Sequence, residues 1–157
     1  MIRRLLFLII VPTLLIGYKI TPVLAQDKKE SLEIQKVVDN FYKSLALGDV
    51  ESMMKHISAN YYDEVNGEIV DYAQFKSTIE NMLDTWFKQY TNFSINYLKI
   101  TKLDIQGDKA TLEVKSRWNG FNVDAARKES GSRKRFFALE KEDGLWKIAR
   151  IKRLGSI

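Results

Sequence analysis

The sequence predicts an α+β fold in which three N-terminal helices pack on a strongly curved antiparallel sheet. Apolar residues recur with helical spacing over residues 31–57 and 72–90, and they alternate with polar residues, as in strands, from residue 92 onward. Helices grouped before strands indicate a helical layer on a sheet, because β-α-β units would alternate the two patterns. The concave face of such a sheet needs covering, so we expect a cone with an internal pocket.

Two helices are expected before residue 60. The apolar stripe of the first helix, which begins at Ser31, comprises Ile34, Val37, Val38, Phe41, Tyr42 and Leu45. Gly48 can adopt the left-handed conformation that ends many helices, and Asp49 can cap the helix that follows. In that short second helix, Val50, Met53, Met54 and Ile57 share one face. The sequence therefore predicts a corner between two helices at Gly48.

A small hairpin and a third helix are expected next. Asn66-Gly67 is a turn signal between two short extended segments. Asp71 followed by Gln74 resembles a capping box with Asp in place of Ser or Thr. The third helix carries a wide aromatic stripe of Tyr72, Phe75, Ile79, Met82, Leu83, Trp86, Phe87 and Tyr90. A stripe of this width predicts packing on a large surface, which we expect to be the sheet.

The first two strands of the sheet are expected between Thr91 and Asn119. Apolar residues alternate after Thr91, and the phase slips near residues 98–100, which predicts a bulge. Residues 110–118 alternate cleanly, as a strand with one buried and one solvated face does. We expect Asn119-Gly120 to interrupt this strand.

The last two strands follow a polar segment. Residues 128–132 are expected to form a loop, and residues 133–141 the third strand. Asp143-Gly144 is the strongest hairpin signal in the chain. It predicts a tight turn into a final strand over residues 145–154.

The first 25 residues have the pattern of a secretory signal peptide. Two arginines precede an apolar run over residues 5–16, and small residues precede Gln26. We therefore expect cleavage before Gln26, a periplasmic or secreted protein, a polar leader over residues 26–30 and one domain over residues 31–157. The alternative is an uncleaved membrane anchor, because the apolar segment is just long enough to span a bilayer.

Composition narrows the chemistry. The 157 residues include no cysteine, which excludes disulfides, thiolate metal sites and cysteine nucleophiles. The single histidine, His56, cannot build a histidine-cluster metal site, and we expect neither a metal nor a cofactor. Residues 127–153 hold ten basic and four acidic side chains, a pattern that we interpret as a solvated strand face. Binding of this basic end to anionic lipid or a cell-wall polymer is the alternative.

The chain resembles the nuclear transport factor 2-like superfamily, including its SnoaL-like and ketosteroid-isomerase-like branches. The segments that carry the resemblance are Phe41-Tyr42 through Leu47-Gly48-Asp49, Met53–Tyr62 and Gly144-Leu145-Trp146-Lys147-Ile148. The resemblance covers nearly all of Ser31–Leu154. It implies a curved sheet wrapped on three helices, an internal pocket, and a homodimer through the outer face of the sheet. Functions in this superfamily range from isomerases and dehydratases to ligand binding without catalysis, so the fold alone does not fix the chemistry.

Catalytic residues are only partly indicated. Isomerase-type members place a tyrosine seven residues before the Gly-Asp pair, where this chain has Phe41, which has no hydroxyl to stabilise an oxyanion. The resemblance implies an acidic base shortly after the second helix, and Asp63 and Glu64 are the candidates. The composition of turns favours another interpretation, in which Asp63, Glu64 and Glu68 are solvated turn residues.

The aromatic residues suggest a ligand site. The pocket candidates are Tyr42, Tyr62, Trp86, Tyr97, Trp118 and Arg135. They could line a flat apolar site, with Arg117 or Arg135 fixing the polar end of a ligand. Aromatic residues at helical or alternating positions are also typical of a core, so for each residue the core is the competing interpretation.

Two functions follow from these observations. The first is an exported domain that binds a small apolar or aromatic ligand, or a partner, without catalysis. The second is a cofactor-independent lyase or isomerase that uses Asp63 or Glu64 as a general base. Nucleic acid is not an expected partner, because the protein is expected to be exported and has no aromatic–basic motif of the RNA-binding kind. Contact with a membrane is expected only through residues 1–25, if these remain uncleaved.

Overall fold

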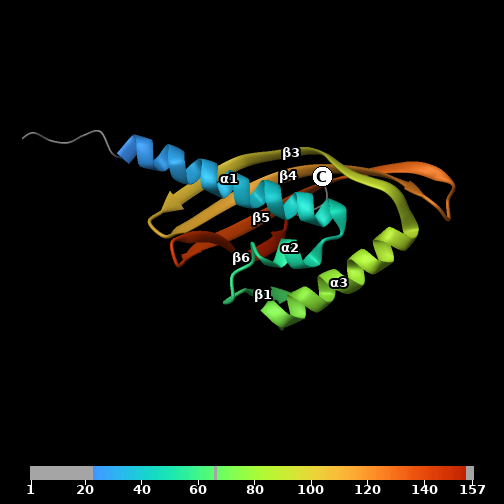
Figure 1. The fold of residues 1–157 in the computed structure, drawn as a ribbon, viewed down its shortest axis with the longest axis horizontal. Coiled ribbons are helices and arrows are strands. Elements are labelled where there is room, and N and C mark those ends of the chain that lie inside the picture. Colours follow the sequence, from blue (N-terminus) through green and yellow to red (C-terminus); the bar gives the residue numbers. More distant parts are fainter. Residues whose placement is uncertain (1–22, 66, 155–157) are drawn as a thin grey trace, which may run out of the picture.

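The computed structural model describes residues 23–65 and 67–154 and confirms the α+β fold (Figure 1). Its elements are α1 (Val23–Leu47), α2 (Val50–Met54), β1 (Tyr62–Val65), β2 (Glu68–Asp71), α3 (Tyr72–Gln89), β3 (Tyr90–Gln106), β4 (Lys109–Asn122), β5 (Arg127–Glu142) and β6 (Leu145–Arg153). The first two strands form a hairpin, and the last four form an antiparallel sheet in sequential order. Residues 1–22 of the expected signal peptide lie outside the described residues, whereas residues 23–26, around the expected cleavage site, belong to the start of α1.

Helix α1 begins earlier than its apolar stripe predicts. The stripe indicated a start at Ser31, but the helix begins at Val23 and passes through the expected leader, residues 26–30. Glu30 is buried, and its carboxylate accepts a hydrogen bond from Lys141 Nζ on β5 at 2.7 Å. This ion pair fixes a turn of the helix that the apolar pattern alone did not indicate.

Helix α1 covers the concave face of the sheet, as the sequence predicts. Ile34 and Val38 are fully buried in one core with Leu112, Val114, Phe137, Leu139 and Ile148 of the sheet. The ring of Phe137 packs edge-on against Phe41 at 5.9 Å between centroids and lies 6.1 Å from Tyr42. In Figure 1 this helix runs alongside the sheet, whereas α2 and α3 lie farther from it.

Helix α3 is less covered than expected. Its capping box is confirmed, because the Asp71 carboxylate accepts from the Gln74 N–H and the Gln74 side chain accepts from the Asp71 N–H. Only Phe75, Ile79 and Leu83 of its wide stripe are buried, and Phe87 is 42% exposed. The helix touches the sheet mainly where it runs into β3. Part of the apolar stripe of α3 is therefore not packed against other residues, and space remains between this helix and its neighbours.

The corner at Gly48 explains where Phe87 lies. Gly48 has a φ of 70°, in the left-handed region, and a Cβ there would come within 2.6 Å of the Phe87 ring. Glycine satisfies both conditions at once. The absent side chain lets the α1–α2 corner lie directly against the C-terminal end of α3.

Two expected breaks in the sheet are wrong. Strand β4 continues through Asn119-Gly120, and residues 128–132 belong to β5, in register with β4. The polar side chains here have partners: Glu129 accepts from the Tyr90 hydroxyl at 2.8 Å and from Arg127 Nε at 3.0 Å. Gly120 leaves room for the Tyr90 ring, because a Cβ there would lie only 3.3 Å from the ring. Hydrogen-bonded polar residues thus lengthen the hairpin without an apolar pattern.

The other signals in the sheet are confirmed. Asp143 and Gly144 have φ values of 50° and 78°, as a two-residue hairpin turn requires. Register shifts between Ile95 and Tyr97 and between Ile100 and Lys102 mark the expected bulge region. Among residues 23–65 and 67–154, no helix is both long and apolar enough to cross a membrane.

Candidate functional site

A cavity of about 440 Å³ lies beneath the N-terminal half of α3. Its lining residues are Tyr61, Asp63, Val65, Glu68, Val70, Phe75, Thr78 and Ile151. They come from the β1–β2 hairpin, from α3 and from β6. The hairpin presents alternate residues to this space because successive side chains of a strand point to opposite faces.

Asp63 is the buried carboxylate of this cavity. It is only 7% exposed, which corrects the expectation of a solvated turn residue, while Glu64 and Glu68 are exposed as expected. Its Oδ1 accepts a hydrogen bond from Arg150 Nε at 2.9 Å. Burial of a charge is tolerated when the charge is paired, and Arg150 supplies that pairing from β6.

Tyr61 lies next to Asp63 on the same face of the hairpin segment. Its ring stacks at 4.4 Å on Phe75 of α3. Burial raises the pKa of the Tyr61 hydroxyl, and the charge of Asp63 raises it further. The hydroxyl therefore stays protonated at neutral pH. The cavity thus combines an apolar wall, a neutral hydroxyl and a paired carboxylate.

Three arginines lie on the concave face beyond α1. Arg133 and Arg135 are in phase with the buried Phe137 on β5, and Arg153 pairs with Arg135 across the β5–β6 ladder. The pKa of Arg133 is lowered first by burial and then by the charges of Arg153 and Arg135. The three guanidinium groups are thus close enough to repel one another.

An aromatic cluster adjoins these arginines at the C-terminal end of α3. The Trp86 ring lies 5.5 Å from Phe93 and 6.5 Å from Trp118, and Phe93 lies 5.8 Å from Trp118. Gly131 seats the indole of Trp118, because a Cβ there would come within 2.6 Å of Nε1. A second cavity, of about 110 Å³, is lined by Trp86, Gln89, Tyr90, Phe93, Trp118 and Arg133. We refer to it as the aromatic–arginine cavity.

The predicted pocket residues divide into two groups. The structure brings Trp86 and Trp118 together, and it places Arg135 Nη1 3.3 Å from the hydroxyl of the buried Tyr42. Tyr62 and Tyr97, by contrast, are 45% and 41% exposed and line none of the cavities described above.

The two exposed tyrosines have arginine neighbours instead. Tyr62 lies under Arg150, with 5.7 Å from the guanidinium carbon to the ring centroid, and Tyr97 lies under Arg117 at 5.5 Å. Arg117 and Tyr97 share the outer face of the sheet, so Arg117 does not fix a ligand in the cone.

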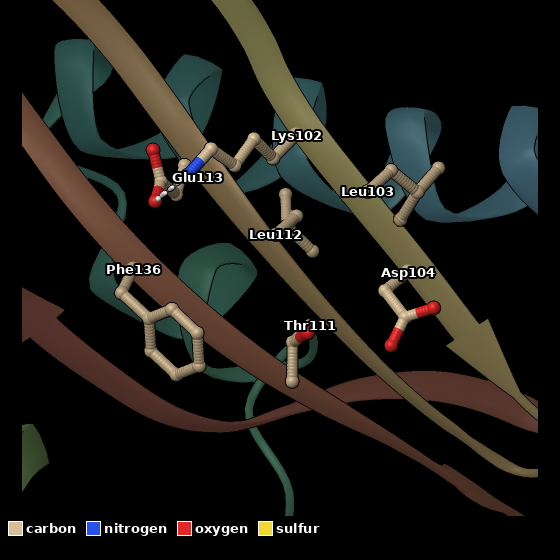
Figure 2. Close-up of a pocket in the computed structure, with 7 residues that line it drawn as sticks. All are labelled: Lys102, Leu103, Asp104, Thr111, Leu112, Glu113 and Phe136. Carbon is tan, nitrogen blue, oxygen red and sulfur yellow. Dashed lines mark ion pairs between the residues drawn. The ribbon is translucent and has the colours of Figure 1, made fainter.

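A shallow hollow also lies on the outer face of the sheet (Figure 2). It occupies about 430 Å³ and is lined by Lys102, Leu103, Asp104, Thr111, Leu112, Glu113 and Phe136. Two of its three charged residues are paired: Glu113 lies 3.1 Å from Lys102 Nζ, and it also lies 2.7 Å from Nζ of the neighbouring Lys134. Hydrogen bonds from Lys134 and Lys102 lower the pKa of Glu113. This hollow therefore has less unsatisfied charge to offer a ligand than the concave face has.

Comparison with known proteins agrees with this geometry. A family model described as a SnoaL-like domain matches residues 34–152. The chain belongs to the SnoaL-like domain family. No curated protein sequence matches the chain.

Solved structures with this SnoaL-like fold include enzymes. A putative scytalone dehydratase from Novosphingobium aromaticivorans is similar with a TM-score of 0.69 and 14% identity, over 85% of this chain and 90% of that one. A type 2 hexachlorocyclohexane dehydrochlorinase (LinA) gives 0.67 and 13%, over 85% and 94%. A nuclear transport factor 2-like superfamily protein from Salmonella enterica serovar Typhimurium gives 0.65 and 13%, over 83% and 94%. The superfamily resemblance is thus confirmed, and at these identities the similarity shows the fold alone.

Sequence reasoning missed several residues that form the two cavities of this SnoaL-like domain. Tyr61, Arg150 and Arg133 were not among the pocket candidates, although each lines or supports one of the cavities. A signal was present for Arg133: it stands an even number of residues from the apolar Phe137 on one strand. No comparable pattern marked Arg150, which reaches Asp63 across 87 positions of sequence.

His56 lies outside these cavities. It is half-buried after α2, and its carbonyl accepts from the Ile148 N–H at 2.8 Å, which ties this segment to β6. Burial lowers the pKa of His56 below its usual 6.5, and the charges of Lys147 and Lys55 lower it further. In the described ranges, no group of three or more His, Asp or Glu side chains could hold a metal ion.

The lowered pKa of His56 predicts acid sensitivity. Just below pH 6.5 the unfolded chain binds more protons at this site than the folded protein, so the free energy of unfolding should fall as the pH drops from about 7 to about 5. Urea unfolding of the wild type and of His56→Asn at both pH values measures this loss. The variant should lose less stability than the wild type, and an equal loss in both proteins would contradict the assignment.

Proposed function

We propose that this SnoaL-like domain is exported and binds a small, mainly apolar molecule in the cavity under α3, without chemical turnover. The cavity volume of about 440 Å³ falls in the usual range for small-ligand sites, about 300–1,000 Å³. Export rests on the charge, apolar run and small residues of the first 25 positions.

One observation carries the choice of binding over catalysis: the buried carboxylate of the cavity is already paired. Asp63 accepts from Arg150 Nε at 2.9 Å, so the carboxylate that would take a proton is already held in an ion pair. A general base must be free to contact the proton that it removes, and this contact engages one of its two oxygens. The ion pair also has a structural role, because it joins β1 to the edge strand β6.

The position of Phe41 supports the same choice. This residue stands where isomerase-type relatives are expected to carry a tyrosine, and here it is buried against Tyr42 and Phe137. It lines neither of the cavities under α3. An oxyanion formed in the larger cavity would therefore have no hydroxyl from this helix position.

A second candidate function is a lyase or isomerase with Asp63 as general base. The observation that favours it is the neighbouring hydroxyl of Tyr61, which stays protonated and lines the same cavity. A base and a neutral donor facing one cavity are the minimum for proton abstraction next to a carbonyl. The enzymes among the solved structures of this fold are compatible with this alternative.

A homodimer through the outer sheet face is a further proposal, which rests on the resemblance. Lys99, Lys115 and Lys134 are direct neighbours across β3, β4 and β5 on this face. Two such rows would repel each other in a face-to-face dimer unless acidic residues of the second copy lay opposite them. Sedimentation at low and high salt would measure this association.

If the cavity under α3 binds apolar molecules, it should bind an apolar dye, and one substitution in its lining should weaken that binding. N-phenylnaphthylamine, a neutral apolar dye, should fluoresce on binding to the full chain and saturate. Thr78→Trp should weaken dye binding at least tenfold, because Thr78 lines the cavity and a Trp side chain there would occupy the space of the dye. Thr78 is exposed at the rim, so the larger side chain should not disturb the core. The matched control is Thr85→Trp, which adds the same ring to an exposed position of α3 that lines neither cavity. Equal affinities of the two variants would contradict the site.

Catalysis by Asp63 can be tested with a generic substrate. Nitrobenzisoxazole opens when a carboxylate removes its ring C–H proton and the N–O bond breaks to release a cyanophenolate. We expect the wild type and Asp63→Asn to open it at the same rate, because Arg150 already stabilises the Asp63 carboxylate. A wild-type rate tenfold or more above that of the variant would overturn binding without turnover and favour the lyase.

A further inference from the structure

We infer that the aromatic–arginine cavity at the C-terminal end of α3 binds the carboxylate end of a small aromatic acid. This site is separate from the cavity of the proposed function, and the two share no lining residue. Phe75 and Trp86, which line one cavity each, are three turns apart on α3, and the buried Ile79 and Leu83 lie between them.

Positive charge gathers beside the aromatic–arginine cavity. Among the described residues, no carboxylate lies within ion-pair distance of Arg133 or Arg135. Arg133 Nη1 donates to the Ser132 carbonyl at 3.1 Å, and Arg135 Nη1 donates to the Tyr42 hydroxyl at 3.3 Å. Each guanidinium has five N–H donors, so most of them have no protein acceptor within residues 23–65 and 67–154. Half-buried cations that repel one another are stabilised by an anion placed among them.

The wall of the cavity beside Arg133 is aromatic. Nε1 of Trp118 is buried and has no hydrogen-bond partner in the described part of the chain. Buried polar groups are normally satisfied, and this N–H, which packs against Gly131, belongs to a residue that lines the cavity. The neighbouring rings of Trp86 and Phe93 provide apolar faces on which an aromatic ring can stack.

Size and shape select the class of ligand. A volume of about 110 Å³ suits a single ring that carries one small acidic group and excludes a nucleotide or a steroid. A carboxylate matches the planar fork of a guanidinium with two parallel hydrogen bonds. Inorganic phosphate would satisfy the arginine but would leave the aromatic faces without a partner. The combination therefore favours an aromatic carboxylate.

Isothermal titration calorimetry with the full chain tests this inference with three probes: benzoate, its neutral isostere benzamide, and inorganic phosphate. We expect benzoate to bind at least tenfold more tightly than benzamide or phosphate. Arg133→Gln should weaken benzoate binding at least tenfold. The matched control is Arg117→Gln, which removes an arginine from the outer face of β4 and should leave benzoate binding unchanged.

A stability measurement and a second variant separate loss of binding from loss of structure. Thermal unfolding of Arg133→Gln should show a fold at least as stable as that of the wild type, because the substitution removes repulsion. Arg135→Gln provides a second variant in the same cluster and should also weaken benzoate. Equal binding of benzoate and benzamide, equal effects of Arg133→Gln and Arg117→Gln, or no binding of any probe would overturn the inference. Tighter binding of phosphate than of benzoate would overturn it in favour of an inorganic anion.

Binding of N-phenylnaphthylamine distinguishes this site from the cavity of the proposed function. Arg133→Gln should leave dye binding under the N-terminal half of α3 unchanged, and Thr78→Trp should leave benzoate binding unchanged. Either site can therefore fail without the other.

Discussion

The packing of α1 on the concave face of the sheet is the contact on which the remaining structure depends. Ile34 and Val38 of the helix are fully buried against the same core as Val114 and Phe137 of the sheet. Each large apolar side chain buried in this way contributes about 1.5–3 kcal/mol, and removing it leaves a cavity that costs more. Because this half of the sheet is closed by α1, the rest of the concave face can carry charges and aromatic rings that a core would not tolerate.

Helix α3 is fixed at both ends and leaves space beside it. It is joined directly to β3 at one end and is capped by Asp71 at the other, so both ends are fixed while its middle spans the distance from the β1–β2 hairpin to the start of β3. Its aromatic residues meet the sheet only near Phe93 and Trp118. The result is one cavity near each end of the helix. One contains the Asp63–Arg150 ion pair, and the other contains an arginine without a carboxylate partner in the described residues.

Much of this architecture could be predicted from the sequence, because local signals set it. The helical stripe of α1, the capping box at Asp71 and the Asp143-Gly144 turn each depend on residues close together in the chain. The errors arose where distant residues decide. Asp63 is buried because Arg150 reaches it from another strand, and the extension of β5 at Glu129 depends on the Tyr90 hydroxyl.

The arginines illustrate the same limit. Alternation places Arg133 and Arg135 on the face of Phe137, but only Arg135 was a pocket candidate, whereas Arg133 was interpreted as part of a solvated basic strand end. Only the curvature of the sheet and the extent of α1 show that this end of the concave face is left uncovered. A strand pattern gives the face of a residue, and the packing of other elements decides whether that face is core, site or surface.

The three tryptophans allow a direct test of the claim that the concave face is closed at one end and open at the other. Trp86 and Trp118 line the aromatic–arginine cavity, whereas Trp146 is buried elsewhere. The centroid of its ring lies 4.9 Å from Nζ of Lys141, which also binds Glu30 of α1. Proton–nitrogen correlation spectra resolve the three indole N–H groups during a benzoate titration. The account predicts saturable shifts of the Trp86 and Trp118 signals with Trp146 unmoved. Equal shifts of all three signals, or a shift of Trp146 alone, would contradict it.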